Sequence, residues 1–184
     1  MNDMEATRDE RPWALVSGAS GGLGQAFSRH LASCGVNLVL TGRRQDVLDD
    51  LAHQLTTRYG LQTIVHPCDS SSASERLALV NEIAGRGIII NTLINNAGFG
   101  AAGRIAQTDP MRQASQVEVN CEAIVHLCGL LLPGMIAAKH GSIINVASTA
   151  AFQPIPQFAT YAASKSVVLS FTPALCDASN GTGV

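Results

Sequence analysis

The letters "YAASK" place a phenol and an ammonium four residues apart, at Tyr161 and Lys165. In a helix this spacing puts both side chains on one face. A phenol with its ordinary pKa of roughly 10 exchanges its proton poorly at neutral pH, whereas a fixed ammonium beside it favours the phenolate. The pair could therefore serve as a general acid–base. Taken alone, it could equally be a surface Tyr and Lys on an amphipathic helix.

A hydroxyl lies upstream of this pair, at Ser148 in "NVAST", directly after an apolar run. The carboxyl ends of the strands in a parallel sheet open into the ligand crevice. A hydroxyl at that place can hydrogen-bond a substrate oxygen as negative charge develops on it. Without such a partner, a serine that follows a strand is an ordinary turn residue.

A glycine-rich turn, "SGASGGLG", follows the first apolar run and contains Gly18, Gly22 and Gly24. Glycines at this spacing let the backbone turn tightly and approach a pyrophosphate, whose charge meets the free N–H groups at the start of a helix. Glycine-rich turns after strands are common, so the motif gains its meaning from its place between a strand and a helix. It predicts dinucleotide binding.

The second apolar run ends in "LTGRR", with Arg43 and Arg44 where NAD-binding folds place an acid for the ribose 2′-hydroxyl. A missing acid and a planar cation suit the 2′-phosphate of NADP. The alternative is two solvated arginines at the start of a helix, where the helix dipole disfavours cations. NADP is therefore the predicted cofactor.

Short apolar runs alternate with longer amphipathic stretches along the chain. Strands are predicted at "WALVSG", "NLVLTG", "QTIVHP", "TLINNAG" and "SIINVAS", and helices at 22–34, 45–59, 72–85, 111–138 and from about 158. The alternation predicts an α/β fold, a Rossmann-type doubly wound parallel sheet flanked by helices. We expect Pro173 to cost about 3 kcal/mol or to end the last helix early.

The domain organisation predicted from the sequence is simple. The charged residues 1–11 are expected to form a disordered N-terminal tail, and residues 12–184 a single dinucleotide-binding domain.

Composition excludes several classes of protein. Apolar residues make up 46% of the 184 residues, and the formal net charge is −2 with scattered Lys and Arg. This favours a compact core and argues against partners such as nucleic acid or an anionic membrane. The apolar run "LCGLLLPGMIAA" is interrupted by Pro133 and is expected to be too short to span a bilayer. A cytoplasmic protein is the resulting prediction.

The five cysteines are odd in number and include no C-x-x-C pair, which argues against a disulfide framework and a zinc site. Cys121 and Cys128 lie seven apart in a predicted helix. They are expected to be small buried side chains on one helix face.

Together these motifs resemble the short-chain dehydrogenase/reductase family over about residues 12–184. The likeness is carried by "SGASGGLG", Asp69 in "HPCDS", "NNAG", Asn120 in "VNCEA", "NVAST" and "YAASK", in the family's order. The "TGRR" strand end is most similar to the NADP-preferring branch of the family.

The resemblance implies an NADP(H)-dependent oxidoreductase that moves hydride between nicotinamide and a small-molecule carbonyl or secondary alcohol. It implies Tyr161 as the general acid–base, Ser148 to orient the substrate oxygen, Lys165 to hold the nicotinamide ribose and lower the tyrosine pKa, and Asn120 to anchor a water. The implied cofactor-binding residues are Gly18, Ser20, Gly22, Leu23, Gly24, Arg43, Asp69, Asn96, Ala97, Gly98, Tyr161 and Lys165.

The end of the chain, "NGTGV", is where family members enter a sixth strand, followed by substrate-binding helices and a seventh strand. The expectation is a domain truncated before the sixth strand, with "SIINVAS" as an exposed apolar edge of the sheet. A homo-oligomer is expected of the complete protein.

Two alternatives to the dehydrogenase reading remain. The first is a non-catalytic remnant that binds nucleotide weakly or acts only through helix-mediated association. The second is a nucleotide-sugar epimerase, although its glycines are usually spaced G-x-x-G-x-x-G. The expected substrate wall is apolar and comprises Phe152, Gln153, Ile155 and Phe158.

Overall fold

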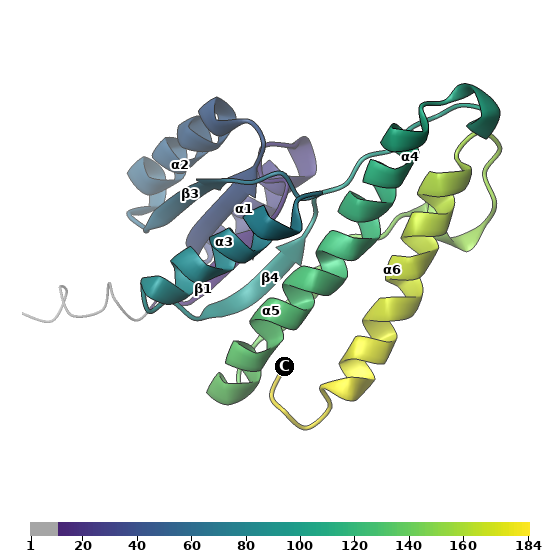
Figure 1. The fold of residues 1–184 in the computed structure, drawn as a ribbon. Coiled ribbons are helices and arrows are strands. Elements are labelled where there is room, and N and C mark those ends of the chain that lie inside the picture. The colour runs from purple at the N-terminus through teal and green to yellow at the C-terminus, as the bar shows by residue number, and fades with distance from the viewer. Residues whose placement is uncertain (1–10) are drawn as a thin grey trace, which may run out of the picture.

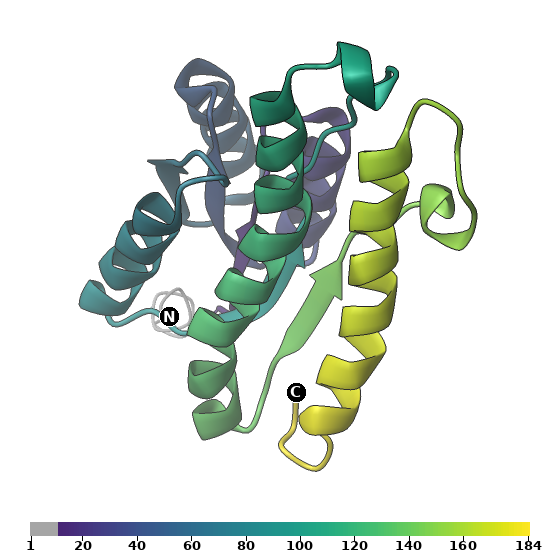
Figure 2. The ribbon, with the colours of Figure 1, turned by 45° about the vertical axis from the view of Figure 1, so that its right-hand side comes forward.

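The computed structural model describes residues 11–184 and contains a parallel sheet covered by helices on both faces (Figures 1 and 2). Residues 1–10, nearly all of the predicted tail, lie outside the described residues. All strand pairs are parallel, in the order β3-β2-β1-β4-β5. The strands are β1 (Trp13–Val16), β2 (Asn37–Gly42), β3 (Thr63–Pro67), β4 (Ile90–Asn95) and β5 (Ser142–Asn145). The predicted doubly wound α/β fold is confirmed.

One face of the sheet is covered by α1 (Gly22–Ser33) and α2 (Gln45–Tyr59). Because side chains alternate along a strand, Ala14 and Val16 of β1 point to this face and pack with Leu38 and Leu40 of β2. These four side chains are fully buried, which explains why both strands read as continuous apolar runs.

The other face is covered by α3 (Ala73–Gly85), α5 (Ala123–Ala138) and α6 (Ala159–Ala178). Leu15, Val39 and Leu93 point to this side, where they join residues of the three helices in a second core cluster. The strand order turns back between β1 and β4, because β2 and β3 extend to one side of β1 and β4 and β5 to the other. Ligand crevices form at the carboxyl ends of strands at such a switch point.

The long helix predicted over 111–138 runs from Pro110 to Ala138 and contains a local irregularity. It consists of α4 (Pro110–Val117), the π-helical turn η2 (Glu118–Glu122) and α5. Pro133 lies inside α5, so the helix continues through this proline, as the predicted range requires.

By length and composition alone, Pro110–Ala138 could cross a membrane, so the expectation that the apolar segment within it is too short to span a bilayer is wrong. A core helix of a layered α/β protein meets the same criteria. Here the helix contributes Ile124, Leu127 and Leu131 to the core beneath the sheet.

Of the two outcomes expected for Pro173, the early end of α6 does not occur, because this helix continues to Ala178. Proline removes the backbone donor that would meet the carbonyl one turn earlier. Beside it, the Thr172 hydroxyl donates to the Val168 carbonyl at 2.8 Å, and Phe171 and Leu175 pack against the second core cluster. Tertiary packing on both sides of the proline therefore holds the helix together.

At one edge of the described sheet, β5 pairs with β4 alone (Figure 2). Ile144 is 44% exposed, which confirms the expected apolar edge. Near the start of β5, the Gly141 amide donates to the Gly183 carbonyl at 3.2 Å. The last described residues therefore return to the amino end of the edge strand. Farther into the core, Cys121 and Cys128 are buried as predicted.

Candidate active site

The glycine-rich turn is built so that side chains cannot replace two of its glycines. Gly18 has φ +63°, and a Cβ atom there would lie 2.8 Å from the Ala97 Cα. A Cβ on Gly24 would overlap the Gly18 carbonyl oxygen and lie 2.8 Å from the Ala19 Cα. Gly24 therefore lets α1 pack closely on the turn after β1, and Gly18 lets that turn lie against the segment after β4.

Gly22 differs from them, because a Cβ there would meet nothing within 4 Å. It begins α1, whose N-cap is Gly21, with no capping side chain and no acidic residue in the first turn. The N–H groups of that turn therefore have no partner within the helix. With the positive end of the helix dipole, they form a place for a phosphate group.

Ser17, the first residue of the glycine-rich turn, ties this turn to the "NNAG" segment. The Ser17 hydroxyl accepts hydrogen bonds from the Asn96 and Ala97 amides, both at 3.0 Å. In return, the Asn96 side-chain amide donates to the Ser17 and Gly18 carbonyls at 3.0 and 3.2 Å. Much of the hydrogen-bonding capacity of Asn96 thus supports the glycine turn.

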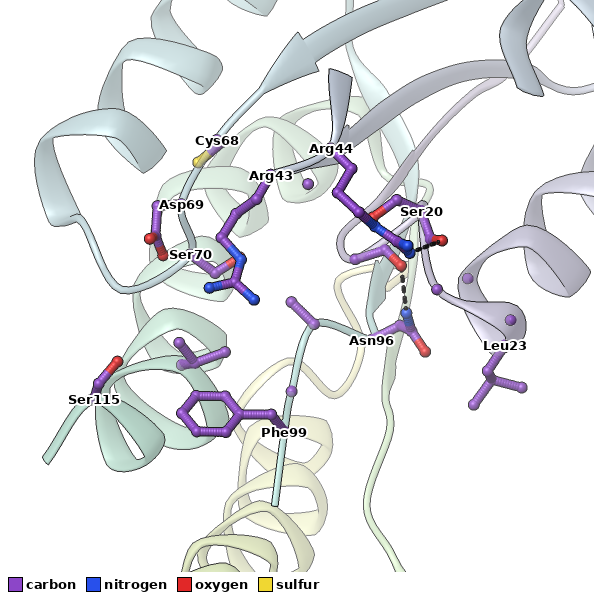
Figure 3. Close-up of a pocket in the computed structure, with 18 of the residues that line it drawn as sticks. Ser20, Leu23, Arg43, Arg44, Cys68, Asp69, Ser70, Asn96, Phe99 and Ser115 are labelled. Atoms are coloured by element: carbon purple, nitrogen blue, oxygen red, sulfur yellow. Dashed lines mark hydrogen bonds between the residues drawn. The ribbon is translucent and has the colours of Figure 1, made fainter. Parts of the chain in front are cut away.

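A cleft of about 730 Å³ opens at the carboxyl ends of the strands (Figure 3). All ten cofactor-binding residues implied outside the Tyr–Lys pair line it: Gly18, Ser20, Gly22, Leu23, Gly24, Arg43, Asp69, Asn96, Ala97 and Gly98. Ten further residues line the cleft and were not among the implied cofactor-binding residues: Gly21, Gly42, Arg44, Cys68, Ser70, Phe99, Gly100, Arg112, Ser115 and Val119. Most are neighbours of a predicted residue, whereas Arg112, Ser115 and Val119 come from α4 and η2.

The two arginines after β2 have different surroundings. Arg44 donates to the Ser20 carbonyl, so it supports the glycine turn. The Arg43 guanidinium points into the cleft, on the side where Asp69 lies (Figure 3). Of these two arginines, Arg43 is therefore the one that remains available to a ligand.

The Asp69 carboxylate accepts hydrogen bonds from the Ser71 amide and hydroxyl, at 3.0 and 2.8 Å. The Ser71 amide lowers the pKa of Asp69 most; burial opposes it, and the Ser71 hydroxyl and the charge of Arg43 lower it further. Asp69 is therefore an ionised residue at the wall of the cleft at neutral pH.

This lowered pKa gives a prediction for stability against pH. The folded-state pKa of Asp69 lies below the unfolded value of 3.8, so its contribution is fully present above 3.8 and is lost as pH falls through the folded-state pKa. Asp69→Asn keeps an acceptor oxygen but removes the titration. Urea unfolding from about pH 5 downward should show a steeper loss of stability in the wild type than in Asp69→Asn. An equal loss of stability with falling pH in the two proteins would contradict the lowered pKa of Asp69.

Asn120 lies in the π-helical turn η2 and is fully buried. Its side-chain amide donates to the Phe99 carbonyl and the Ser164 hydroxyl, both at 3.0 Å, and its oxygen accepts from the Phe99 amide at 3.1 Å. Single π-helical turns are frequent at functional sites. Asn120 holds the Gly98–Gly100 turn against α6, and both amide hydrogens are already used.

Tyr161 and Lys165 lie on the first turns of α6, beside the same Gly98–Gly100 turn. A Cβ on Gly100 would be 3.4 Å from the Tyr161 ring, and one on Gly98 would be 3.5 Å from the Lys165 Nζ. The Tyr161 ring packs edge-to-face on Phe158, with ring centroids 6.2 Å apart. The glycines of this turn therefore bring the cleft and the Tyr–Lys pair together.

The Lys165 ammonium is buried and donates to the Val146 carbonyl at 2.7 Å. Burial lowers the pKa of Lys165, and the charge of the Cys121 thiolate would oppose this effect. Val146 follows β5, so the ammonium spans from α6 to the end of the edge strand. An ammonium has three donors, and this contact leaves two for a ligand.

Ser148 lies just beyond β5, as predicted, and caps the 3₁₀ turn η3 (Thr149–Phe152). Its hydroxyl oxygen accepts from the Ala150 amide at 3.2 Å, which leaves the hydroxyl hydrogen available. Of the expected apolar wall, Phe158 contacts Tyr161, whereas Phe152 is 74% exposed at the surface. The wall is therefore only partly formed by the described residues.

Comparisons with known proteins agree with this geometry. A family model described as short chain dehydrogenase matches residues 12–184. The chain is 33% identical over 176 residues to the very-long-chain 3-oxoacyl-CoA reductase of Pyrenophora tritici-repentis (strain Pt-1C-BFP), covering 94% of this chain and 52% of that protein. It is 32% identical over 165 residues to the inactive hydroxysteroid dehydrogenase-like protein 1 of Homo sapiens, covering 89% and 50%.

A solved structure gives the same result. The crystal structure of a metagenomic short-chain oxidoreductase in complex with NADP matches with a TM-score of 0.88 and 32% identity, covering 94% of this chain and 78% of that one. The chain thus spans about half the length of the two curated relatives.

Proposed function

We propose, from the premise that this chain belongs to the short-chain dehydrogenase family, that it is an NADP(H)-dependent oxidoreductase acting on a small carbonyl compound or secondary alcohol. Residues 12–184 would be its dinucleotide-binding domain. The proposal rests on the observation that the cleft and the Tyr161–Lys165 pair form one continuous site. The cleft with the glycine turn and Arg43 meets the Tyr161–Lys165 pair at the Gly98–Gly100 turn.

The cleft fits the proposed cofactor in shape and charge. The unpartnered N–H groups at the start of α1 and the open space above Gly22 suit a pyrophosphate. Arg43 suits the 2′-phosphate, and Phe99 and Val119 offer apolar surface. When bound, NADPH would supply the hydride.

The chain's own residues would handle the proton and the substrate oxygen. The Tyr161 hydroxyl would donate a proton to the oxygen during reduction and take one back during oxidation. The free hydroxyl hydrogen of Ser148 would hydrogen-bond the same oxygen. Lys165 keeps two donors for the nicotinamide ribose. Asn120 would fix the Gly98–Gly100 turn on which these positions depend.

The two arginines allow a test of cofactor choice. Arg43→Ala should weaken NADPH binding by roughly 10- to 100-fold, because a charged hydrogen bond contributes about 1.5–3 kcal/mol, and should leave NADH binding unchanged. Arg44→Ala should weaken both cofactors, since Arg44 supports the glycine turn through the Ser20 carbonyl. Fluorescence titration of each variant with both cofactors measures this. If Arg43→Ala lowers the affinity for NADPH and for NADH equally, Arg43 does not recognise the 2′-phosphate.

Turnover itself is tested by following nicotinamide absorbance with the purified chain, NADPH and a panel of ketones and aldehydes. The proposal predicts consumption of NADPH that depends on the carbonyl compound and runs in reverse with the matching alcohol and NADP. The control is the same mixture with the Tyr161→Phe variant. Saturable NADPH binding without turnover on any compound would leave cofactor binding intact and contradict the oxidoreductase proposal.

A second candidate is a non-catalytic protein that binds nucleotide. It is favoured by the likeness to the human relative named as inactive. The turnover assay separates the two candidates, because they share cofactor binding and differ only in chemistry. The cytoplasmic location and the homo-oligomer stay predictions.

A further inference from the structure

Arg76 is the one charged side chain among the largest fully buried residues of the described chain. It lies near the start of α3, and its side chain is only 1% exposed. Arginine is almost never fully buried unless its donors are paired. Neither the glycine motif nor the Tyr–Lys chemistry requires this residue, so its burial needs its own explanation.

The guanidinium reaches three partners from two separate parts of the chain. Its Nη1 donates to the Ser70 carbonyl, its Nη2 to the Glu122 carboxylate, and its Nε to the His126 Nδ1 at 3.1 Å. Ser70 belongs to the loop after β3, whereas Glu122 and His126 lie one helical turn apart where η2 passes into α5. One side chain therefore joins a loop to a helix.

The loop end of this link is a wall of the cleft. Cys68, Asp69 and Ser70 all line the cleft, and the Asp69 amide donates to the Glu75 carboxylate at 2.8 Å. Glu75 and Arg76 are neighbours in α3, so this helix holds the loop at two successive residues. No residue of the loop except Cys68 is fully buried, so apolar packing alone does not fix it.

The helix end of the link is the π-helical turn that carries Asn120. Glu122 closes η2, and Asn120 within it holds Phe99, which belongs to a second wall of the cleft. Val119 of the same turn lines the cleft directly. Arg76 therefore connects the Cys68–Ser70 wall to the turn that sets the position of Phe99.

We propose that Arg76 is a positioning residue that fixes the spacing between the two walls of the cleft and so sets its affinity for the adenine end of the dinucleotide. The consequence for affinity rests on the proposed function. The link itself does not, because it can be tested in the protein without any ligand. Glu122 is 51% exposed, so its charge is not stranded when Arg76 is changed.

The first test is hydrogen exchange of the ligand-free chain, read peptide by peptide. Arg76→Met should increase exchange at residues 68–72 and 118–122 together, since both segments lose the same partner. Glu122→Ala, a change at a half-exposed residue, is the variant to use if Arg76→Met fails to fold; it should increase exchange in the same two segments. Increased exchange confined to 118–122 in Glu122→Ala and to α3 in Arg76→Met would overturn the link.

Two control variants, one within α3 and one at its C-cap, test whether a general loss of stability causes the increased exchange. Arg86→Met removes an exposed arginine paired with Glu82 and should leave both segments unchanged. Leu79→Ala destabilises the core between α3 and α5 without touching the loop. If Leu79→Ala at equal loss of stability reproduces the pattern of Arg76→Met, Arg76 has only a structural role.

The second test is binding of adenosine 2′-phosphate, which occupies only the adenine end, alongside NADPH. Arg76→Met should weaken both by a similar factor, roughly tenfold, and Arg86→Met neither. If Arg76→Met increases hydrogen exchange in both segments but leaves the affinity for both probes unchanged, the positioning role is overturned. Failure of the wild type to bind either probe would instead contradict the proposed function, and the exchange result would still decide the link.

Discussion

Replacing Tyr161 with phenylalanine should lower carbonyl reduction by about 10²- to 10⁴-fold, the range that a positioned general acid–base contributes. The ring keeps its edge-to-face contact with Phe158, so the fold and the NADPH affinity should not change. Steady-state rates and a fluorescence titration of the same preparation measure both quantities. The change removes one hydroxyl, for which the structure gives no hydrogen-bond partner within the described residues.

The chain contains a matched control, because it has only one other tyrosine. Tyr59 is the last residue of α2 and does not line the cleft. The centroid of its ring lies 5.4 Å from the Arg58 guanidinium carbon. Tyr59→Phe should keep full activity. Comparable turnover in Tyr161→Phe and the wild type would remove Tyr161 from the mechanism, whatever the cofactor affinity.

Gly24→Ala should destabilise the fold even without cofactor. The added methyl would overlap the Gly18 carbonyl oxygen and lie 2.8 Å from the Ala19 Cα, and neither backbone atom can move away freely. Overpacking of this kind costs about 1–3 kcal/mol, a large part of the roughly 5–15 kcal/mol that keeps a domain folded. We expect a lower midpoint in urea unfolding and loss of NADPH binding.

Gly22→Ala is the control for this change, two residues away in the same helix. A methyl there meets no atom within 4 Å, so the stability should be equal or higher by up to about 1 kcal/mol. NADPH affinity should still fall, because the methyl enters the cleft where the pyrophosphate would lie. Equal stability of Gly24→Ala and the wild type would contradict the close packing of α1 on the turn after β1.

The layers of the fold could be predicted because the inner strands carry apolar runs that are buried on both faces of the sheet. The run at 37–42 is buried at every position, which is what a central parallel strand requires. Strand ends were harder to predict. The runs "WALVSG" and "SIINVAS" continue past Val16 and Asn145 into the site, where their residues leave the ladder and reach toward the cleft.

The local rule that lets Pro173 end α6 early does not include tertiary packing, and the early end does not occur. Pro133 and Pro173 both lie inside helices. In each case apolar neighbours on the sheet side, such as Met135 and Leu175, stabilise the helix across the proline. The π-helical turn also had no sequence signal, since it results from how α4 and α5 pack on the rest of the chain.

The candidate site was predictable where a motif combines rare residue types with fixed spacing. The glycine turn and Arg43 were found in this way, and they line one cleft. Residues that act through contacts between distant segments were not. Ser17 bonds to residues 96 and 97, and Arg76 to residues 122 and 126, pairings that only the folded chain reveals.

The most direct test of the central claim is a fluorescence titration of the purified 184-residue chain with NADPH, with NADH in parallel. We predict saturable binding of NADPH and at least about tenfold weaker binding of NADH, because in the proposal Arg43 binds the 2′-phosphate that NADH lacks. Absence of NADPH binding by the folded chain, or equal affinity for the two cofactors, would contradict the account.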